Sequence, residues 1–511
     1  MPRAGRRHRH ERAHAPSPRA GAGRGGSSRD DGRRRDRRRR ERPPSPSSLA
    51  RPRLARDAPL AVPSHLASRR PALRAALVLE GRAAGTRPEG GGQTADDPRV
   101  SRPGAPPGGP VVTTDVIVVG AGPAGAATAI LLAEHGLSVR LLDRARFPRP
   151  KICGEYLSPE APRLLDRLGA LKAVDAVASP LTGMRITAPD GTTLVGTYRR
   201  IGSWRPYREH AMAIPREALD AILVDRVRSL PVDFSEHVRV TDVIVSGDHV
   251  QGVEALDADN RRLTLRAPLT IAADGRASVI VQRLGLRRPH RLQRMALVTY
   301  VEDVQGLGRL GEIFVDPPDY AILNPVAPGR ANLSVVVPLA HAMPWSGRLD
   351  AFFAARVKQL PHLARRIAGG HRVAPVRAMG PLAYRVDAPR VGGVLVVGDA
   401  AGFFDPFTGE GIFKGLRSAE LAAETAVRAL RRGDVSAQAL AGYDRARRRA
   451  SRDKERLTHA LQVVIAHRRL ANLTARLLVR RQRLLDLLLG VLGDYVPPRA
   501  LVTGILARSR S

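Results

Sequence analysis

The feature that most constrains the fold is a glycine-rich turn between a short apolar strand and a helix. Residues 115–119 read DVIVV and lead into GAGPAG at 120–125. A short run of uncharged, β-branched residues is typical of a parallel strand buried on both faces. The small residues of 126–135 predict a helix that ends at Gly136, and 138–142 predict a second strand. Together these segments predict a βαβ unit, and therefore an α/β fold with a parallel sheet.

Each glycine of the turn has a physical role in holding a dinucleotide. Gly120 makes the tight turn, Gly122 lets a pyrophosphate approach the backbone, and Gly125 lets the helix pack closely on the strand. The helix N-terminus offers unbonded amides and a partial positive charge to the phosphates. Asp143 lies at the end of the second strand, 21 residues beyond Gly122, and can accept hydrogen bonds from ribose hydroxyls. The turn therefore predicts a dinucleotide site.

Two later segments favour a flavin over a nicotinamide nucleotide. Residues 269–275 (LTIAADG) predict a strand that ends in Asp274, and 393–397 (GVLVV) predict a strand that leads into Gly398 and Asp399. A domain for NAD alone needs neither segment, whereas the ribityl chain and ring of a flavin extend beyond the pyrophosphate. The carboxylate of Asp399 can bond a ribityl hydroxyl; the alternative is a helix N-cap only.

A third segment, DPFTGEGI at 405–412, leads into a long Ala-rich helix. The amides near Gly411 and Ile412 begin that helix and can face the pyrimidine edge of a flavin ring. Negative charge grows on this edge when the flavin is reduced, so the helix dipole would stabilise the reduced state. The three segments, in this order, predict FAD.

The motifs resemble those of FAD-dependent oxidoreductases with the p-hydroxybenzoate hydroxylase fold, and most closely those of the geranylgeranyl reductase family. The resemblance covers roughly residues 113–440 and rests on DVIVVGAGPAG, FPRPKICGEYLSP, AIPREALDAIL, AADG and GDAAGFFDPFTGEGI. One departure is Glu155, where many geranylgeranyl reductases carry glycine. The flavin contacts that the resemblance implies are Gly120, Gly122, Pro123, Ala124, Gly125, Asp143, Arg144, Cys153, Arg216, Val240, Asp274, Gly398, Asp399, Gly409, Gly411 and Ile412.

The resemblance also implies roles for two of these positions and an architecture for the chain. Arg216 would reach the pyrophosphate from a helix start, and Val240 would meet the adenine through its backbone. A Rossmann-like FAD-binding domain would be interleaved with an antiparallel substrate sheet and followed by C-terminal helices. The expected parts are a disordered basic tail at 1–112, FAD-binding segments at 113–177, 213–292 and 386–440, substrate-sheet segments at 178–212 and 293–385, and helices at 441–511.

Cys153 is the sole cysteine of the chain, so no intrachain disulfide and no all-cysteine metal site can form within it. In the resembled family the matching cysteine lies near the flavin ring and the reacting double bond. Cys153 is therefore a candidate proton donor tuned by Lys151, or else a small side chain packed in a tight turn. Glu155 is either an acid–base residue or a carboxylate that orders the loop by bonding backbone amides. No metal site is predicted.

The chemistry is left open between two reactions. The first transfers a hydride from reduced FAD to a carbon–carbon double bond of a lipophilic, isoprenoid or polyketide-like substrate. The second is an NAD(P)H-dependent monooxygenation of an aromatic or polyketide compound. NAD(P)H or another external reductant would serve either one, and KxCGE at 151–155 favours the first. The expected pocket wall contains Tyr300, Phe314, Tyr320 and Phe407, whose spacing fits core packing equally well.

The N-terminal segment differs sharply in composition from the rest. Residues 1–112 contain 26 Arg, no Lys, 10 acidic residues and no Phe, Trp or Tyr, in a chain whose formal net charge is +36. Such a segment cannot offset its ordering entropy, so we expect disorder. Its Arg run at 33–40 can attract nucleic acid or anionic lipid, but without aromatic side chains no specific nucleic-acid binding is expected. The interpretation that we favour is that this segment is GC-rich sequence translated from upstream of a true start near Val111.

Beyond residue 441 the pattern predicts helices. Leu457, Leu461 and Leu473 belong to an apolar series at helical spacing, interspersed with arginines. A helical cap on the core is one interpretation, and peripheral contact with the inner face of a membrane is the other. No apolar run approaches the 18 or more residues that a spanning helix needs, and no secretory leader stands out, so a cytoplasmic location is expected.

Overall fold

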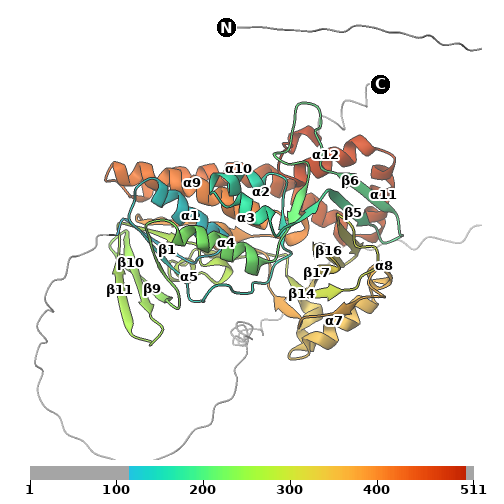
Figure 1. The fold of residues 1–511 in the computed structure, drawn as a ribbon, viewed down its shortest axis with the longest axis horizontal. Coiled ribbons are helices and arrows are strands. Elements are labelled where there is room, and N and C mark those ends of the chain that lie inside the picture. The colour runs from blue at the N-terminus through green and yellow to red at the C-terminus, as the bar shows by residue number, and fades with distance from the viewer. Residues whose placement is uncertain (1–113, 502–511) are drawn as a thin grey trace, which may run out of the picture. The chain divides into compact units, whose positions relative to one another are not determined.

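The predicted βαβ unit forms the centre of a five-stranded parallel sheet in the computed structural model, which describes residues 114–501 (Figure 1). β1 (Val116–Val119) pairs with β2 (Val139–Leu142) on one side and β12 (Leu269–Ala272) on the other. β8 (Val232–Ser235) and β21 (Val394–Val396) complete the order β21-β12-β1-β2-β8. All of β1 is buried, as its apolar run predicts. The predicted disorder of residues 1–112 concerns a segment outside the described residues.

Helices cover one face of this sheet. They are α1 (Pro123–Glu134), α4 (Arg216–Arg228) and α9 (Gly411–Arg431), which pack through alanine and leucine side chains against β1 and β2. α1 begins at Pro123, three residues before the predicted start at Ala126. The first helical position tolerates proline because its amide would be unpaired there anyway.

A three-stranded antiparallel sheet covers the opposite face. It consists of β9 (Arg239–Ser246), β10 (His249–Leu256) and β11 (Arg262–Arg266). Val250 and Val253 of β10 share a core with Val119 and Leu142 of the parallel sheet. The parallel strands are therefore enclosed on both faces, which explains their continuous apolar sequences.

Most of the strands in the two segments expected to bind substrate form one eight-stranded sheet. Its strands are β18 (His371–Arg372), β14 (Arg294–Glu302), β17 (Arg330–Pro338), β16 (Asp319–Ala327), β15 (Leu310–Asp316), β5 (Gly183–Thr187), β6 (Thr193–Thr197) and β19 (Arg377–Met379), the last pairing with β14. An antiparallel sheet was expected, and every ladder is antiparallel except β15–β5. That pair is parallel because a long connection, which returns through the parallel sheet, separates the two strands.

The two faces of the eight-stranded sheet pack on different partners. α7 (Leu349–Lys358) and α8 (Pro361–Arg366) cover one face through a core that includes Phe352 and Leu363. The other face shares a core with the C-terminal helices. Short sheets join the regions: β3 (Tyr156–Leu157), β7 (Ala211–Ala213) and β4 (Ser179–Leu181), and β13 (Arg287–Pro289), β20 (Tyr384–Val386) and β22 (Gly402–Phe403).

The C-terminal part is helical, as predicted. α10 (Ala437–Ala466) has 30 residues and runs along α9, and α11 (Arg468–Val479) and α12 (Gln482–Leu492) follow it. Both α11 and α12 pack against β6. Among residues 114–501 no helix combines the length and the apolar character needed to cross a bilayer. The remaining helices are α2 (Ala161–Arg167), α3 (Leu171–Asp175), α5 (Val279–Arg283) and α6 (Leu339–Ala342).

Candidate functional site

The carboxyl ends of four parallel strands meet at one edge of the sheet. The backbone amide of Gly120 donates to Leu142 O (2.7 Å), which ties the turn after β1 to the end of β2. The Val397 amide donates to Ala272 O (2.9 Å), which ties the segment after β21 to β12. Gly120, Asp143, Asp274 and Asp399 therefore lie at the same edge, where ligands of open parallel sheets bind.

The glycine turn has the close backbone packing that its sequence predicts. Gly120 has φ +99°, and a Cβ there would lie 2.6 Å from Ala273 O. A Cβ at Gly125 would lie 1.8 Å from Gly120 O, so only glycine lets α1 approach the turn. At Gly122 a Cβ would meet nothing nearer than Arg149 Nη2 (3.8 Å) and Arg216 Nη2 (3.9 Å). Open space bordered by two cations therefore faces the start of α1.

The two arginines beside Gly122 share one fully buried carboxylate. Arg216 donates to Asp220 through Nε (2.8 Å) and Nη2 (2.7 Å), and Arg149 Nη1 lies 3.3 Å from Asp220 Oδ2. Arg149 Nη1 is buried without a hydrogen-bond partner among the described residues. Arg149 also lies 3.6 Å from Asp143 Oδ2. A buried guanidinium nitrogen that has no hydrogen-bond acceptor, beside a helix N-terminus, fits a pyrophosphate.

Asp143 holds the glycine turn in this structure. Its Oδ2 accepts from the Ala121 amide (2.7 Å) and its Oδ1 from the Ala145 amide (2.9 Å). Neighbouring Arg144 is exposed. Val240 is buried in β9, whose start is tied to β2 because the Val238 amide donates to Asp143 O (2.9 Å). The expected ribose and adenine contacts are thus on adjacent segments, but they stay predictions.

Asp274 and Asp399 differ in how their carboxylates are satisfied. Asp274 Oδ2 accepts from the Val279 amide (2.8 Å), so this group orders the turn before α5. The Asp399 carboxylate accepts no hydrogen bond from residues 114–501, although the residue is partly buried. Burial raises its pKa, and Arg216, Arg276, Lys151 and Lys414 oppose that rise. A carboxylate without a partner, surrounded by cations, fits a ligand that brings hydroxyl groups.

The third predicted flavin segment precedes α9. Gly409 has φ +66°, and a Cβ there would lie 2.6 Å from Tyr156 Cδ1. Around Gly411 only Phe403 Cε2 would come within 4 Å of a Cβ, at 3.8 Å, whereas Ile412 is buried in the core. Glu410 between the glycines is bound by Lys414 Nζ (2.8 Å) and Lys454 Nζ (3.2 Å). The second predicted flavin segment lies close to α1 at Gly398, because a Cβ added there would be 2.7 Å from Ala124 Cβ.

The Cys153–Glu155 loop connects the segments predicted to bind FAD with the eight-stranded sheet. Asn332 of β17 donates to Cys153 O (3.0 Å), and Asn324 of β16 donates to Gly154 O (2.8 Å). Glu155 adopts a left-handed backbone (φ +58°), which non-glycine residues rarely adopt. The loop is held in this conformation from both sides.

The Glu155 carboxylate is saturated with donors. Its Oε1 accepts from the Arg216 amide (2.9 Å) and Tyr300 OH (2.6 Å), and its Oε2 accepts from Asn332 Nδ2 (3.2 Å). Burial raises its pKa, and these hydrogen bonds counter the rise. Of the two interpretations of Glu155, this geometry supports a loop-ordering carboxylate.

The thiol of Cys153 is half-buried beside Arg216. Its Sγ accepts a hydrogen bond from the Glu155 amide (3.3 Å). Desolvation by burial raises the pKa of the thiol. Arg216 of α4 is a cation whose charge opposes this rise, and the expected tuning by Lys151 stays a prediction.

The predicted pocket-wall aromatics do not share one face. Tyr300 contacts Glu155, and Tyr320 packs edge-on against Phe407 with ring centroids 5.2 Å apart. Phe314 packs with α7 and α8 on the far side of the sheet. Alternate residues of a strand point to opposite faces, so Phe314 belongs to the other core than Ile313 and Val315. Placing Phe314 in the wall was wrong.

The sequence analysis missed three groups of this site. Arg149 lies within the quoted FPRPK motif but was not singled out. Asn324 and Asn332 lie in otherwise apolar strands. A buried side-chain amide needs a hydrogen-bond partner, so an asparagine at such a position could have been recognised from the sequence as a candidate site residue. Tyr300 was assigned only to the wall.

A model of the FAD-binding domain family matches residues 113–458, about two thirds of the chain. The chain belongs to this FAD-binding family. It is an FAD-dependent oxidoreductase, and FAD is its cofactor.

Two curated relatives and one solved structure illustrate the relationship. A digeranylgeranylglycerophospholipid reductase of Methanosphaerula palustris is 28% identical over 65% of this chain and 80% of its own length. A menaquinone reductase of Mycolicibacterium smegmatis is 30% identical over 61% of this chain and 75% of its own length. A flavin-dependent brominase superposes with a TM-score of 0.67 at 20% identity, covering 78% of this chain and all of the brominase. That superposition establishes the shared fold alone.

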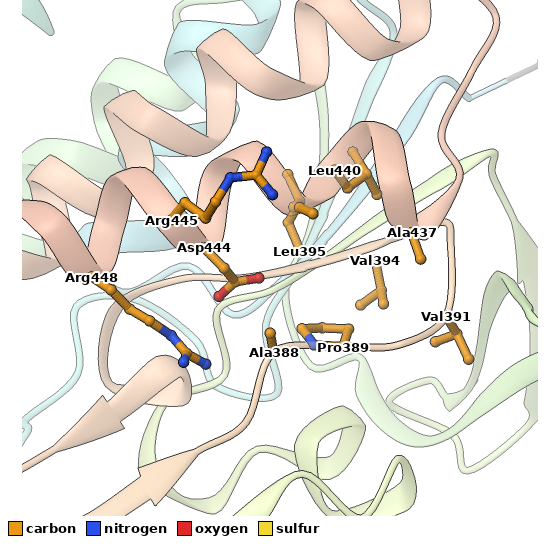
Figure 2. A pocket seen from close by; sticks show the side chains of 11 residues that line it. Ala388, Pro389, Val391, Val394, Leu395, Ala437, Leu440, Asp444, Arg445 and Arg448 are labelled. Atoms are coloured by element: carbon orange, nitrogen blue, oxygen red, sulfur yellow. The ribbon is translucent and has the colours of Figure 1, made fainter.

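A separate cavity lies between β21 and α10 (Figure 2). The segment before β21 provides Ala388 and Pro389, and α10 provides Leu440, Arg445 and Arg448. None of the predicted FAD-binding residues lines it. We therefore place the flavin site at the strand ends and not in this cavity.

Proposed function

We propose that this FAD-dependent oxidoreductase reduces a carbon–carbon double bond of a lipophilic, isoprenoid-type substrate. The observation that carries the proposal is the position of the Cys153 thiol, in a loop that is hydrogen-bonded both to Arg216 and to β17 of the eight-stranded sheet. The names of the two curated relatives, a digeranylgeranylglycerophospholipid reductase and a menaquinone reductase, support a lipophilic substrate.

The residues at the strand ends would hold the cofactor. Gly120, Gly122 and Gly125 leave room for the pyrophosphate, and Arg149 and Arg216 would neutralise it. Asp399 would accept a ribityl hydroxyl. When bound, reduced FAD would supply a hydride, which carries two electrons. An external donor such as NAD(P)H would then reduce the flavin again.

Reduction of a double bond needs one hydride and one proton, so that one C=C π bond breaks and two C–H bonds form. The chain has to provide the proton. Burial keeps the Cys153 thiol protonated at neutral pH, and Arg216 stabilises the thiolate that remains after the proton leaves. The half-buried thiolate then regains a proton from water. Glu155 holds the loop while this occurs, because its acceptor atoms are bonded to Arg216, Tyr300 and Asn332.

The deciding experiment is stopped-flow oxidation of the anaerobically reduced holoenzyme. We expect rapid reoxidation by a geranylgeranyl-bearing lipid and slow, unproductive reoxidation by oxygen. Cys153→Ala should slow the lipid reaction about 10²- to 10⁴-fold, the range for losing a general acid, without loss of bound flavin. A transient flavin hydroperoxide absorbance with oxygen, and no reaction with prenyl lipids, would contradict the proposal and support a monooxygenase.

A further inference from the structure

Exposed apolar side chains concentrate on one short stretch of the described structure. Ten large apolar residues are exposed among residues 114–501, and five of them lie between 463 and 479. They are Val463, Leu470, Leu473, Leu477 and Val479, with exposed fractions of 55, 36, 65, 44 and 49%. Single exposed apolar residues need no explanation, but a cluster indicates an interaction surface.

Three of these residues form one face of α11. Leu470, Leu473 and Leu477 recur at helical spacing, so their side chains lie along one side of the helix. The buried residues of the same helix, Ala471, Ala475 and Leu478, face the core. The helix therefore has apolar residues on its packed side and a second apolar stripe directed to solvent. Figure 1 shows α11 outside β5 and β6, at the opposite end of the domain from β9, β10 and β11.

Cations flank this stripe without acidic partners. Within residues 468–483, the exposed arginines with no ion pair to a described residue are Arg469, Arg480, Arg481 and Arg483. By contrast, Arg468 and Arg476 pair with Asp316 and Asp190. No Asp or Glu occurs between residues 456 and 485 of the sequence. The net charge of this segment is therefore positive, even though Asp316 and Asp190 neutralise two of its arginines.

We propose that this surface binds the headgroup region of an anionic lipid bilayer. We call it the α11 surface and define it by Leu470, Leu473, Leu477 and the unpaired Arg469, Arg480, Arg481 and Arg483. The leucines would enter the boundary between headgroups and acyl chains, and the arginines would contact lipid phosphates. The inference does not depend on the reaction that the enzyme catalyses.

Charge argues against a second copy of the chain as the occupant. Two α11 surfaces facing each other would bring their arginines together with no carboxylate on the α11 surface to compensate them. The exposed leucines also distinguish this surface from a nucleic-acid site, which would be polar and basic throughout. A bilayer with anionic headgroups complements both the apolar stripe and the cations.

A tryptophan at Leu473 in the full chain reports insertion directly. The fluorescence that Leu473→Trp adds is the difference from the parent protein, which has two tryptophans. Vesicles of dibrominated phosphatidylcholine with 30% phosphatidylserine should quench this added fluorescence. The control is Val245→Trp, another exposed apolar position (44%, against 65% for Leu473), which lies on β9 at the far end of the domain. We expect no quenching of its added signal. Equal quenching of both, or of neither, would overturn the proposal.

Vesicle co-sedimentation separates the α11 surface from the Arg-rich N-terminal segment. The double variant Arg480→Gln, Arg481→Gln should bind phosphatidylserine vesicles about 30-fold more weakly, at about fivefold per charge. Leu473→Ser with Leu477→Ser should abolish the binding that survives in 0.5 M NaCl, where contacts of charge alone are screened. Unchanged binding of both variants would assign the affinity to residues 1–112 and refute the proposal. Concentration-dependent self-association of the parent, lost in the leucine variant, would assign the surface to a second copy instead.

Discussion

Replacing Asp399 should separate cofactor binding from folding. The carboxylate has no hydrogen-bond partner within the described residues, and cations surround it. A hydrogen bond to a charged acceptor contributes about 1.5–3 kcal/mol, and 1.4 kcal/mol is a factor of ten in Kd. Asp399→Ala should therefore weaken FAD binding up to about hundredfold. Asp399→Asn keeps an acceptor oxygen but loses the charge, so we expect about tenfold.

The same substitutions should not reduce the stability of the apoprotein, although they weaken FAD binding. Burial raises the pKa of Asp399, so the native state disfavours the ionised form. Between the unfolded pKa, about 3.9, and the raised native pKa, this group lowers the free energy of unfolding as pH rises. Above both pKa values, the full destabilisation from burying the ionised carboxylate is present. Asp399→Asn removes it, and the apoprotein should be unchanged or more stable by about 1 kcal/mol at neutral pH.

The assay is titration of the deflavinated protein with FAD, followed by quenching of flavin fluorescence, with urea unfolding of the apoprotein in parallel. Asp248→Asn, an exposed carboxylate in the turn before β10, is the matched control and should change neither quantity. An Asp399→Asn protein that binds FAD within twofold of the parent would refute the assigned role. So would a loss of affinity accompanied by an equal loss of apoprotein stability.

Three further outcomes test the site. Gly125→Ala should yield protein without the yellow flavin absorbance, because its Cβ would lie 1.8 Å from Gly120 O; Gly308→Ala, where nothing lies within 4 Å, should remain fully yellow. Arg149→Gln should weaken FAD binding about tenfold by losing a charged donor, whereas the same change at exposed Arg146 should not, and equal effects would contradict the pyrophosphate role. Because burial raises the thiol pKa of Cys153, the lipid-reduction rate should stay level through pH 8 and fall only at higher pH as the proton is lost; a fall centred below pH 7 would exclude the thiol as donor.

Local sequence determined the parts of the site that one segment can encode. Backbone geometry and burial within a few residues explain three features: the apolar sequence of β1, the glycines at 120, 122 and 125, and the start of α9. These patterns sufficed for the FAD-binding fold. The start of α1 was misplaced by three residues, because proline is tolerated at the first helical position.

Only the tertiary structure decided how distant groups meet. Asn324 and Asn332 bind a loop 170 or more residues away, and no local pattern identifies which carbonyl a buried amide will reach. Arg216, a cation beside Cys153, comes from α4, and Phe314 faces away from the site because register sets its side. Local propensity arises from neighbours in the chain, whereas hydrogen-bond partners and sheet faces arise from how the finished layers pack.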